Sequence, residues 1–157
     1  MTRPGELRLA RWAEFDFEKA VFEIPASRMK GRKSHSVPLS RQAIDILKAL
    51  QPITGRSALV FPGLNSPTRP ISENTLNGCL RRLEYGQDEM TAHGWRSTAS
   101  TLLNQSGRWS PDAIERALAH ADRDKIRGIY NRGAFWDERV QMMQFYADYL
   151  DELRAGV

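Results

Sequence analysis

A series of helix-start signals in the last three quarters of the chain most constrains its fold. Ser40, Ser72 and Thr91 each precede a segment whose apolar residues recur three or four positions apart, the pattern of an amphipathic helix. The Ser-Pro-Asp run at 110–112 is the strongest signal, because it combines a capping hydroxyl, proline at the first helical position and an acid in the first turn. We therefore expect the chain after residue 40 to be mainly helical.

Strand-like patterns precede these helices. Residues 21–24 alternate between apolar and polar character, and residues 35–39 form a second short strand in which Pro38 indicates a sheet edge or a strand end. A basic turn, Lys-Gly-Arg-Lys at 30–33, lies between the two. Residues 59–61 are the candidate third strand, and residues 63–70 read as a loop. The sequence thus predicts a small antiparallel sheet with a cationic hairpin tip.

The fold class that follows is α+β and mainly α: a helical domain with a small three-stranded antiparallel sheet on one side. A final helix should present a narrow apolar stripe made of Val140, Met143, Ala147, Leu150 and Leu153. We expect one domain over residues 1–157. Because helical composition begins directly after Pro4, with no supporting element before it, we also expect the chain to be a fragment of a longer protein.

Composition narrows the class of protein. Hydrophobic residues make up 41% of the 157, which argues against wholesale disorder, and no stretch reaches the roughly 20 consecutive apolar residues of a membrane span. The single cysteine, Cys79, excludes an internal disulfide and fits a reducing cytoplasm. The net charge of +4 permits nucleic-acid binding, but it fits an ordinary basic soluble protein equally well.

Six residues with a common chemistry stand in separate clusters along the chain. They are Arg3, Lys30, His93, Arg96, His120 and Tyr130. Arginine grips phosphate oxygens in a bidentate fork, and tyrosine can attack a phosphodiester and hold it covalently. Lysine or protonated histidine can supply the proton that an expelled alkoxide needs. No carboxylate cluster indicates a magnesium site, so we expect no metal and no cofactor, with protein cations stabilising the transition state.

Spacing supports part of this set. His93 and Arg96 stand three positions apart on a predicted helix and can face the same target. His120 ends another predicted helix, and Tyr130 follows ten positions later, which is consistent with a turn that brings its hydroxyl back.

The motifs around these residues resemble those of the tyrosine recombinase (phage integrase) family. Arg3 opens Arg-Pro-Gly-Glu-Leu, which looks like the family's first arginine box, and residues 93–96 match its His-x-x-Arg box. Residues 118–120 resemble its Leu-Gly-His box, with alanine replacing the commoner glycine. Tyr130 stands where the family's nucleophile is expected, and Lys30 precedes a Val-Pro-Leu segment as the family's hairpin lysine does. The motifs occur in the family's order over essentially the whole chain.

Further segments are similar to those of integrases that move prophages and genomic islands. They are residues 14–16, 28–30, 35–40 and 91–94. The resemblance implies site-specific recombination at double-stranded DNA attachment sites by a homo-tetramer. Accessory proteins set the direction between integration and excision, no membrane is involved, and the isolated fragment could be a monomer.

The resemblance also implies a role for each residue. Arg3, Arg96 and His120 would bind the scissile phosphate, and His93 would assist by hydrogen bonding or proton transfer. Lys30 would protonate the 5′-oxygen, and Tyr130 would form a 3′-phosphotyrosyl bond. In such families a C-terminal segment often docks onto a neighbouring subunit, whereas most amphipathic helices pack on their own domain.

Alternatives remain at several positions. Arg32 and Lys33 share the basic turn with Lys30, and His93 beside Trp95 could be a core histidine. Glu6 is expected to orient a neighbouring basic side chain rather than to react. A zinc site built from His93, His120 and Cys79 matches no ligand spacing and lacks a fourth ligand.

Two other functions also fit these residues. A type IB topoisomerase-like nicking and closing enzyme uses the same chemistry without synapsis, and a DNA-binding module could have lost catalysis.

Overall fold

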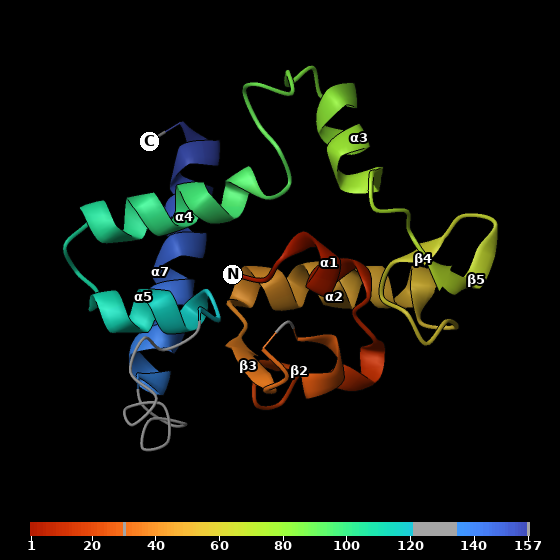
Figure 1. Cartoon of the computed structure of the whole chain (residues 1–157), viewed down its shortest axis with the longest axis horizontal. Helices are drawn as coiled ribbons and strands as arrows, with labels where there is room; N and C mark the ends of the chain where they lie inside the picture. The colour runs from red at the N-terminus through yellow and green to blue at the C-terminus, as the bar shows by residue number, and fades with distance from the viewer. Residues whose placement is uncertain (30, 121–134, 157) are drawn as a thin grey trace.

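The computed structural model describes residues 1–29, 31–120 and 135–156, and it confirms the predicted mainly helical architecture with a small sheet on one side (Figure 1). The helices are α1 (Pro4–Arg8), α2 (Arg41–Thr54), α3 (Thr75–Arg82), α4 (Gly94–Gln105), α5 (Pro111–Ala117) and α7 (Trp136–Ala155), with short 3-10 turns η1 (Trp12–Glu14) and η2 (Ala26–Arg28). The strands are β1 (Phe15–Asp16), β2 (Val21–Ile24), β3 (His35–Pro38), β4 (Pro62–Gly63) and β5 (Ser66–Pro70). None of the helices described is long and apolar enough to cross a bilayer.

The three-stranded sheet is antiparallel in the order β1-β2-β3. Phe22 of β2 pairs with Phe15 of β1 on one side and with Val37 of β3 on the other, so three apolar residues lie next to one another across the sheet. The third strand was expected at residues 59–61, and this was wrong. Leu59 makes only an isolated bridge with Arg11, because β1 already fills the edge beside β2.

A second correction concerns residues 63–70, which were expected to be a loop. They form most of the β4–β5 hairpin, in which Pro62 pairs with Pro70 and Gly63 with Ser66. Prolines at 62, 67 and 70 hide the strand pattern in the sequence, because proline cannot donate to a ladder and normally argues against a strand. A two-stranded hairpin tolerates them, since its outer edges need no partner.

The predicted helix starts are mostly present. The hydroxyls of Ser40, Thr91 and Ser110 accept hydrogen bonds from the backbone nitrogens of Ala43, Gly94 and Ala113, respectively, at 3.0–3.3 Å. Ser72 is the exception. Its hydroxyl pairs with the hydroxyl of Thr75 at 3.0 Å, and Asn74 takes the N-cap position of α3.

Two hydrophobic clusters hold the domain together. The first lies between the sheet and α2 and consists of Ala10, Phe22, Ile24, Met29, Val37, Leu47 and Val60. The second lies among α4, α5 and α7 and consists of Leu103, Ile114, Ala117, Leu118, Met142 and Met143. The candidate site therefore has to be assembled where these two halves meet.

The apolar stripe predicted on the last helix was partly wrong. Arg139, Met142 and Met143 are the buried residues of α7, whereas Val140 is exposed. Arg139 can lie inside because it donates to the Ser36 carbonyl of β3 and stacks over Trp136, with the guanidinium carbon 5.4 Å from the ring centroid. A buried arginine is invisible to a search for apolar periodicity.

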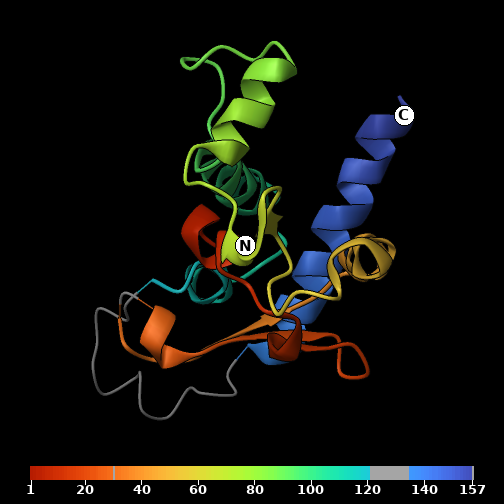
Figure 2. The same cartoon turned by 90° about the vertical axis from the view of Figure 1, so that its right-hand side faces the viewer.

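The outer end of α7 runs beside the start of α2 (Figure 2). The side-chain amide of Gln42 donates to the carboxylates of Asp148 and Asp151, at 2.8 Å in each case. Beyond these contacts Leu150 and Leu153 remain exposed. The first part of α7 thus completes the domain's own core, and its last turns extend past it.

Candidate active site

Arg3 stands at the N-cap of α1, where Pro4 fixes the start of the helix. The carboxylate of Glu6 holds it twice, since Oε1 accepts from Nη1 and Oε2 accepts from the Arg3 backbone nitrogen, both at 2.7 Å. Glu6 is buried and Arg3 only partly so. Glu6 thus orients the side chain of Arg3, as expected from the sequence. The Arg3 guanidinium is held through Nη1 by the Glu6 carboxylate.

Arg96 lies buried in the first turn of α4 and joins distant parts of the chain. Its Nη1 donates to the Met1 carbonyl and its Nη2 to the Leu118 carbonyl at the end of α5. Burial lowers the pKa of Arg96 from its ordinary value, and the nearby charge of Arg3 lowers it further. The two arginines are close in space although they are far apart in sequence, since they contact neighbouring carbonyls.

Both arginines reach the segment that precedes His120. Arg3 Nη2 lies 3.5 Å from the Ala119 carbonyl, next to the carbonyl that Arg96 holds. Two cations that are far apart in the sequence thus converge on the turn after α5. A guanidinium has five donors, so each arginine keeps N–H groups that could bind a phosphate.

The turn itself ends α5 in a Schellman motif. The Ala119 nitrogen donates to the Arg116 carbonyl at 3.0 Å, and the His120 nitrogen donates to the Glu115 carbonyl at 3.2 Å. Ala119 takes the left-handed conformation, with φ at +50°. This explains why glycine is the commoner residue at this position of the resembling motif, since a residue without Cβ adopts such a φ without strain.

His120 emerges from this turn with one ring nitrogen engaged. Its Nδ1 lies 2.7 Å from Oε2 of Glu115, and both side chains are about half exposed. A carboxylate only accepts hydrogen bonds, so Nδ1 carries a proton and Nε2 is the nitrogen left for a substrate. Glu115 was not among the sequence candidates. A signal for it does exist in the sequence. Glu115 is a carboxylate about one helical turn before the end of the predicted helix that His120 follows.

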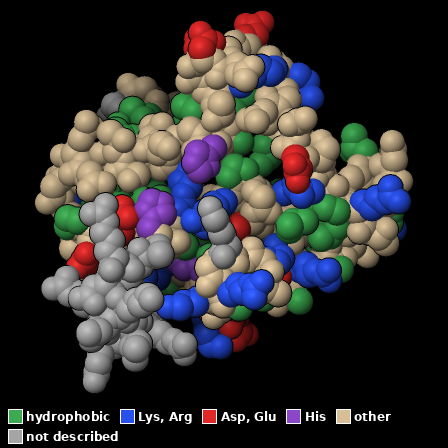
Figure 3. All heavy atoms as spheres, in the orientation of Figure 1, with side chains coloured by type: hydrophobic (Ala, Val, Ile, Leu, Met, Phe, Trp, Pro, Cys, Tyr) green, Lys and Arg blue, Asp and Glu red, His purple; other side chains and the backbone are tan. Residues whose placement is uncertain are grey.

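His93 occupies the N-cap position of α4 rather than its first turn, and the hydroxyl of Thr91, two residues earlier, accepts from the Gly94 nitrogen at 3.0 Å. The His93 backbone oxygen still accepts from the Arg96 nitrogen at 3.1 Å, so the two residues stay one turn apart as expected. The His93 side chain is exposed, which excludes the alternative of a core histidine. Figure 3 shows histidine, arginine and lysine side chains gathered near the centre of this face.

The other two candidates, Lys30 and Tyr130, lie outside the described residues. The turn next to Lys30 exposes Arg32 and Lys33, the two rival cations of the sequence analysis. The structure thus brings Arg3, Arg96 and the His120 turn together and leaves two of the six candidates unplaced. Within the described part of the chain, no three histidine, cysteine or acidic residues are arranged to hold a metal ion.

Comparisons with known proteins agree with this architecture. The fold is similar to a crystal structure of XerA recombinase, with a TM-score of 0.61 and 18% identity over 88% of this chain and 51% of the other. At that identity the likeness concerns the fold alone. The model of the phage integrase family matches residues 1–135, so the chain belongs to the phage integrase family.

Curated relatives are similar over nearly the whole chain. The integrase of Enterobacteria phage P4 is 45% identical over 95% of this chain, and the prophage integrase IntZ of Escherichia coli (strain K12) is 47% identical over 98%. The chain spans only 37% and 38% of the lengths of these two relatives.

Proposed function

We propose that this chain is the catalytic part of a site-specific DNA recombinase that cuts and rejoins DNA through a 3′-phosphotyrosyl intermediate. The observation that carries the proposal is the convergence of Arg3 and Arg96 on the turn that presents His120. Cations fixed by buried or backbone partners are preorganised for a phosphate, and they lose little freedom when one binds. The family membership and the names of the relatives support the same activity.

The chemistry assigns a task to each residue. The Tyr130 hydroxyl gives its proton to a base, a role that His93 can fill, as its oxygen attacks the scissile phosphorus. A new bond forms between them, and the bond from phosphorus to the 5′-oxygen breaks. Lys30 gives its proton to that oxygen as it leaves. Arg3, Arg96 and His120 bind the non-bridging oxygens, on which negative charge develops, and His93 assists by hydrogen bonding or proton transfer.

The bond to tyrosine conserves the energy of the phosphodiester. The 5′-hydroxyl of another strand can therefore attack it and restore DNA without ATP. We propose that four subunits of the full-length protein assemble on attachment-site DNA and exchange strands in this way. Accessory proteins would set the balance between integration and excision.

The test is covalent trapping on duplex DNA that is nicked beside the scissile phosphate, followed by mapping of the modified residue. We expect the adduct on Tyr130. The Tyr130→Phe variant should form none while binding DNA normally, and Tyr149→Phe serves as the matched control. An adduct at wild-type yield in Tyr130→Phe would overturn the assignment. Supercoil relaxation without recombinant products would instead support the topoisomerase-like alternative.

The acid is tested separately. Lys30→Ala should slow cleavage of an ordinary phosphodiester, but it should cleave a 5′-bridging phosphorothiolate normally, because sulfur leaves without a proton. Equal defects on both substrates would remove Lys30 from this role. The same rescue in Lys33→Ala would transfer the role to Lys33.

A further inference from the structure

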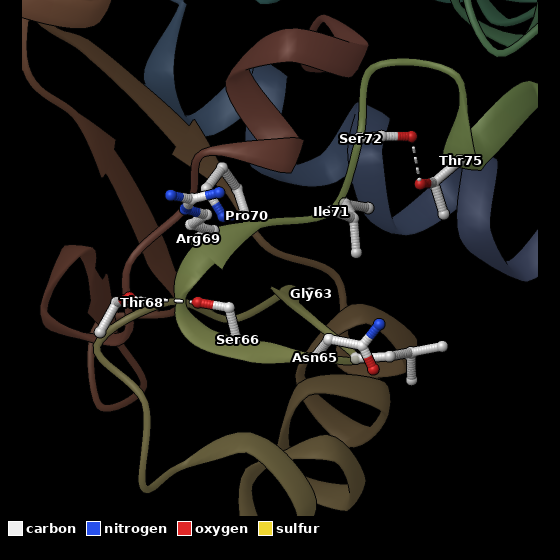
Figure 4. Close-up of a pocket in the computed structure, with 10 residues that line it drawn as sticks. Gly63, Asn65, Ser66, Thr68, Arg69, Pro70, Ile71, Ser72 and Thr75 are labelled. Carbon is white, nitrogen blue, oxygen red and sulfur yellow. Dashed lines mark hydrogen bonds between the residues drawn. The ribbon is translucent and has the colours of Figure 1, made fainter.

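Two adjoining grooves flank the β4–β5 hairpin, away from the candidate active site. The larger has a volume of about 680 Å³, and Figure 4 shows Arg69 and the hydroxyls of Ser66, Thr68, Ser72 and Thr75 among its lining side chains. The smaller, of about 350 Å³, is lined by Arg11, Arg56, Ser57 and Thr68, among others. No acidic residue lines either groove. Their polar side chains are thus arginines, hydroxyls and the amide of Asn65, all of which can donate hydrogen bonds to an anion.

The three arginines of these grooves are available for a ligand. Arg11, Arg56 and Arg69 are exposed, and none of them forms an ion pair with any residue in the described ranges. Other arginines nearby are committed, because Arg8 pairs with Glu73 and Arg28 with Glu14. The two grooves therefore carry uncompensated positive charge in a chain whose net charge is only +4.

Hydrogen bonds tie the grooves to α1, the helix that positions Arg3, and to the chain that follows it. The Trp12 nitrogen donates to the Ala58 carbonyl at 3.1 Å, and the Val60 nitrogen donates to the Ala10 carbonyl at 2.9 Å. Arg8, in the last turn of α1, donates from Nη1 to the Ile71 carbonyl at 3.1 Å, just after β5. The grooves and α1 therefore form one connected piece (Figure 1).

The length of chain between the site and the grooves limits their separation. Arg3 and Arg11 are eight residues apart, so they are at most about 29 Å apart even if fully extended, and α1 shortens this. One helical turn of B-DNA is roughly 34–36 Å long. A duplex with its scissile phosphate at Arg3 could therefore place a further phosphate in the smaller groove within a single turn, and the larger groove adjoins it at Thr68.

We propose that the β4–β5 grooves bind phosphates of the duplex beside the cleavage site, with Arg11, Arg56 and Arg69 as the contacts. The proposal rests on the proposed function, since it takes attachment-site DNA as the ligand. Arginine forks and hydroxyls fix the position of a backbone and carry no sequence information. The grooves therefore contribute affinity and register, and the Arg3–Arg96 cluster carries the chemistry.

The test compares two variants of equal charge in the full chain. Arg56→Gln/Arg69→Gln removes groove cations, and Lys48→Gln/Arg154→Gln removes two exposed cations from α2 and α7. Binding of a fluorescent duplex of about three helical turns, of arbitrary sequence, is measured by anisotropy over a range of salt concentrations. Far-UV circular dichroism and thermal unfolding check that all variants remain folded.

The groove variant should bind roughly 10- to 30-fold more weakly near 0.15 M salt, with a salt slope smaller by about 1.8, because each phosphate contact contributes about 0.9. The control should bind as the wild type does. An unchanged slope in the groove variant, or equal losses in both variants, would overturn the proposal.

Covalent trapping at saturating protein separates this proposal from the proposed function. The groove variant should reach the wild-type rate once all DNA is bound. Failure of the wild type to form an adduct would contradict the proposed function and leave the binding result intact. A groove variant that binds normally but cleaves slowly would assign these arginines to the reaction instead, and would also overturn the proposal.

Discussion

His120 Nδ1 lies 2.7 Å from Oε2 of Glu115, while the His120 backbone nitrogen donates to the carbonyl of the same glutamate. One residue of α5 thus holds both the main chain and the ring of the histidine that follows the helix. Because Nδ1 is held, the ring cannot turn freely, and Nε2 has one preferred direction. The charge of Glu115 also acts on Arg96, since it opposes the lowering of the Arg96 pKa.

Glu115 should therefore matter for cleavage mainly through His120, which it holds at both the ring and the main chain. We expect Glu115→Ala to slow covalent trapping on the order of 10-fold, the lower range for losing the orienting partner of a functional histidine at metal sites. Glu115→Gln, which keeps an acceptor, should lose less. In a double-mutant cycle, Glu115→Ala should have little further effect once His120 is alanine. Additive losses would mean that Glu115 acts elsewhere, and Glu152→Gln on α7 is the control for an exposed carboxylate.

Arg96→Lys should impair cleavage although it keeps the charge. A lysine has one nitrogen and cannot bridge the carbonyls of Met1 and Leu118 while also offering a fork to phosphate. By analogy with an oxyanion-hole donor, the loss of rate should be on the order of 10²–10³. Single-turnover cleavage measures it, with Arg154→Lys as the control. Near-normal cleavage would reduce Arg96 to a structural link between α4 and α5.

Glu6→Ala should lower stability as well as activity. The substitution leaves the Arg3 backbone nitrogen and guanidinium without their carboxylate at a partly buried site. Loss of a buried partner costs about 1–3 kcal/mol. Thermal unfolding checks the stability and covalent trapping checks the activity. Full activity in a destabilised Glu6→Ala protein would show that Arg3 needs no orienting partner.

His35 should make folding stability depend on pH. Burial lowers its pKa from 6.5 to about 4, and the positive charge of nearby Arg139 contributes, whereas Glu6 acts in the opposite direction. The unfolded chain therefore binds more protons than the folded one in this window, so stability is complete above pH 6.5 and falls as pH falls toward 4. The loss should be about 3 kcal/mol across the window, as an upper value.

Urea unfolding at pH 7 and pH 4.5 measures this dependence. The nitrogen Nε2 of His35 is buried without a hydrogen-bond partner in the described residues, so His35→Leu should flatten the pH dependence without a large loss at pH 7. His93→Gln, at an exposed position, should retain the full dependence. An unchanged slope in His35→Leu would assign the effect to other groups.

The sequence predicted those features whose signals are local. Capping hydroxyls such as Ser40 and Ser110 act on their own next turn, so helix starts could be located without any tertiary information. The meeting of Arg3 with the Ala119 turn joins residues more than a hundred positions apart, and no periodicity encodes it. Only the resemblance of the motifs to a known family placed them together in advance.

Where the prediction failed, a tertiary contact overrode the local pattern. The β4–β5 hairpin was missed because its prolines conceal the strand pattern. The buried face of α7 was missed because it includes Arg139, which donates to the Ser36 carbonyl of β3 and stacks over Trp136. Glu115 was missed because a glutamate about one helical turn before a helix end is a weak signal by itself, even with a histidine after the helix. Its partner becomes visible only when the cap geometry turns His120 back along α5.

The last helix yields the final prediction, on whether α7 serves its own domain or a neighbour. If the helix docked only on another subunit, truncation after Arg132 would leave a folded monomer. The structure argues against that outcome, because Met142 is fully buried among α4 and α5 side chains. We now expect that truncation to unfold the protein, and Met142→Ala alone to cost about 2–5 kcal/mol. Urea unfolding of Met142→Ala tests this.

What remains free for a neighbour is the end of α7, where Leu150 and Leu153 are 40% and 54% exposed. Leu150→Glu/Leu153→Glu should therefore keep the wild-type unfolding midpoint and the wild-type yield of covalent adduct on a single site. If the proposed tetramer uses this end, the variant should lose recombinant product and the assembly of two sites, as seen by gel shift. Ile46→Glu/Ile53→Glu, on the exposed face of α2, adds the same charge elsewhere and should recombine normally. Wild-type recombination by the α7 variant would show that the helix acts only within its own subunit.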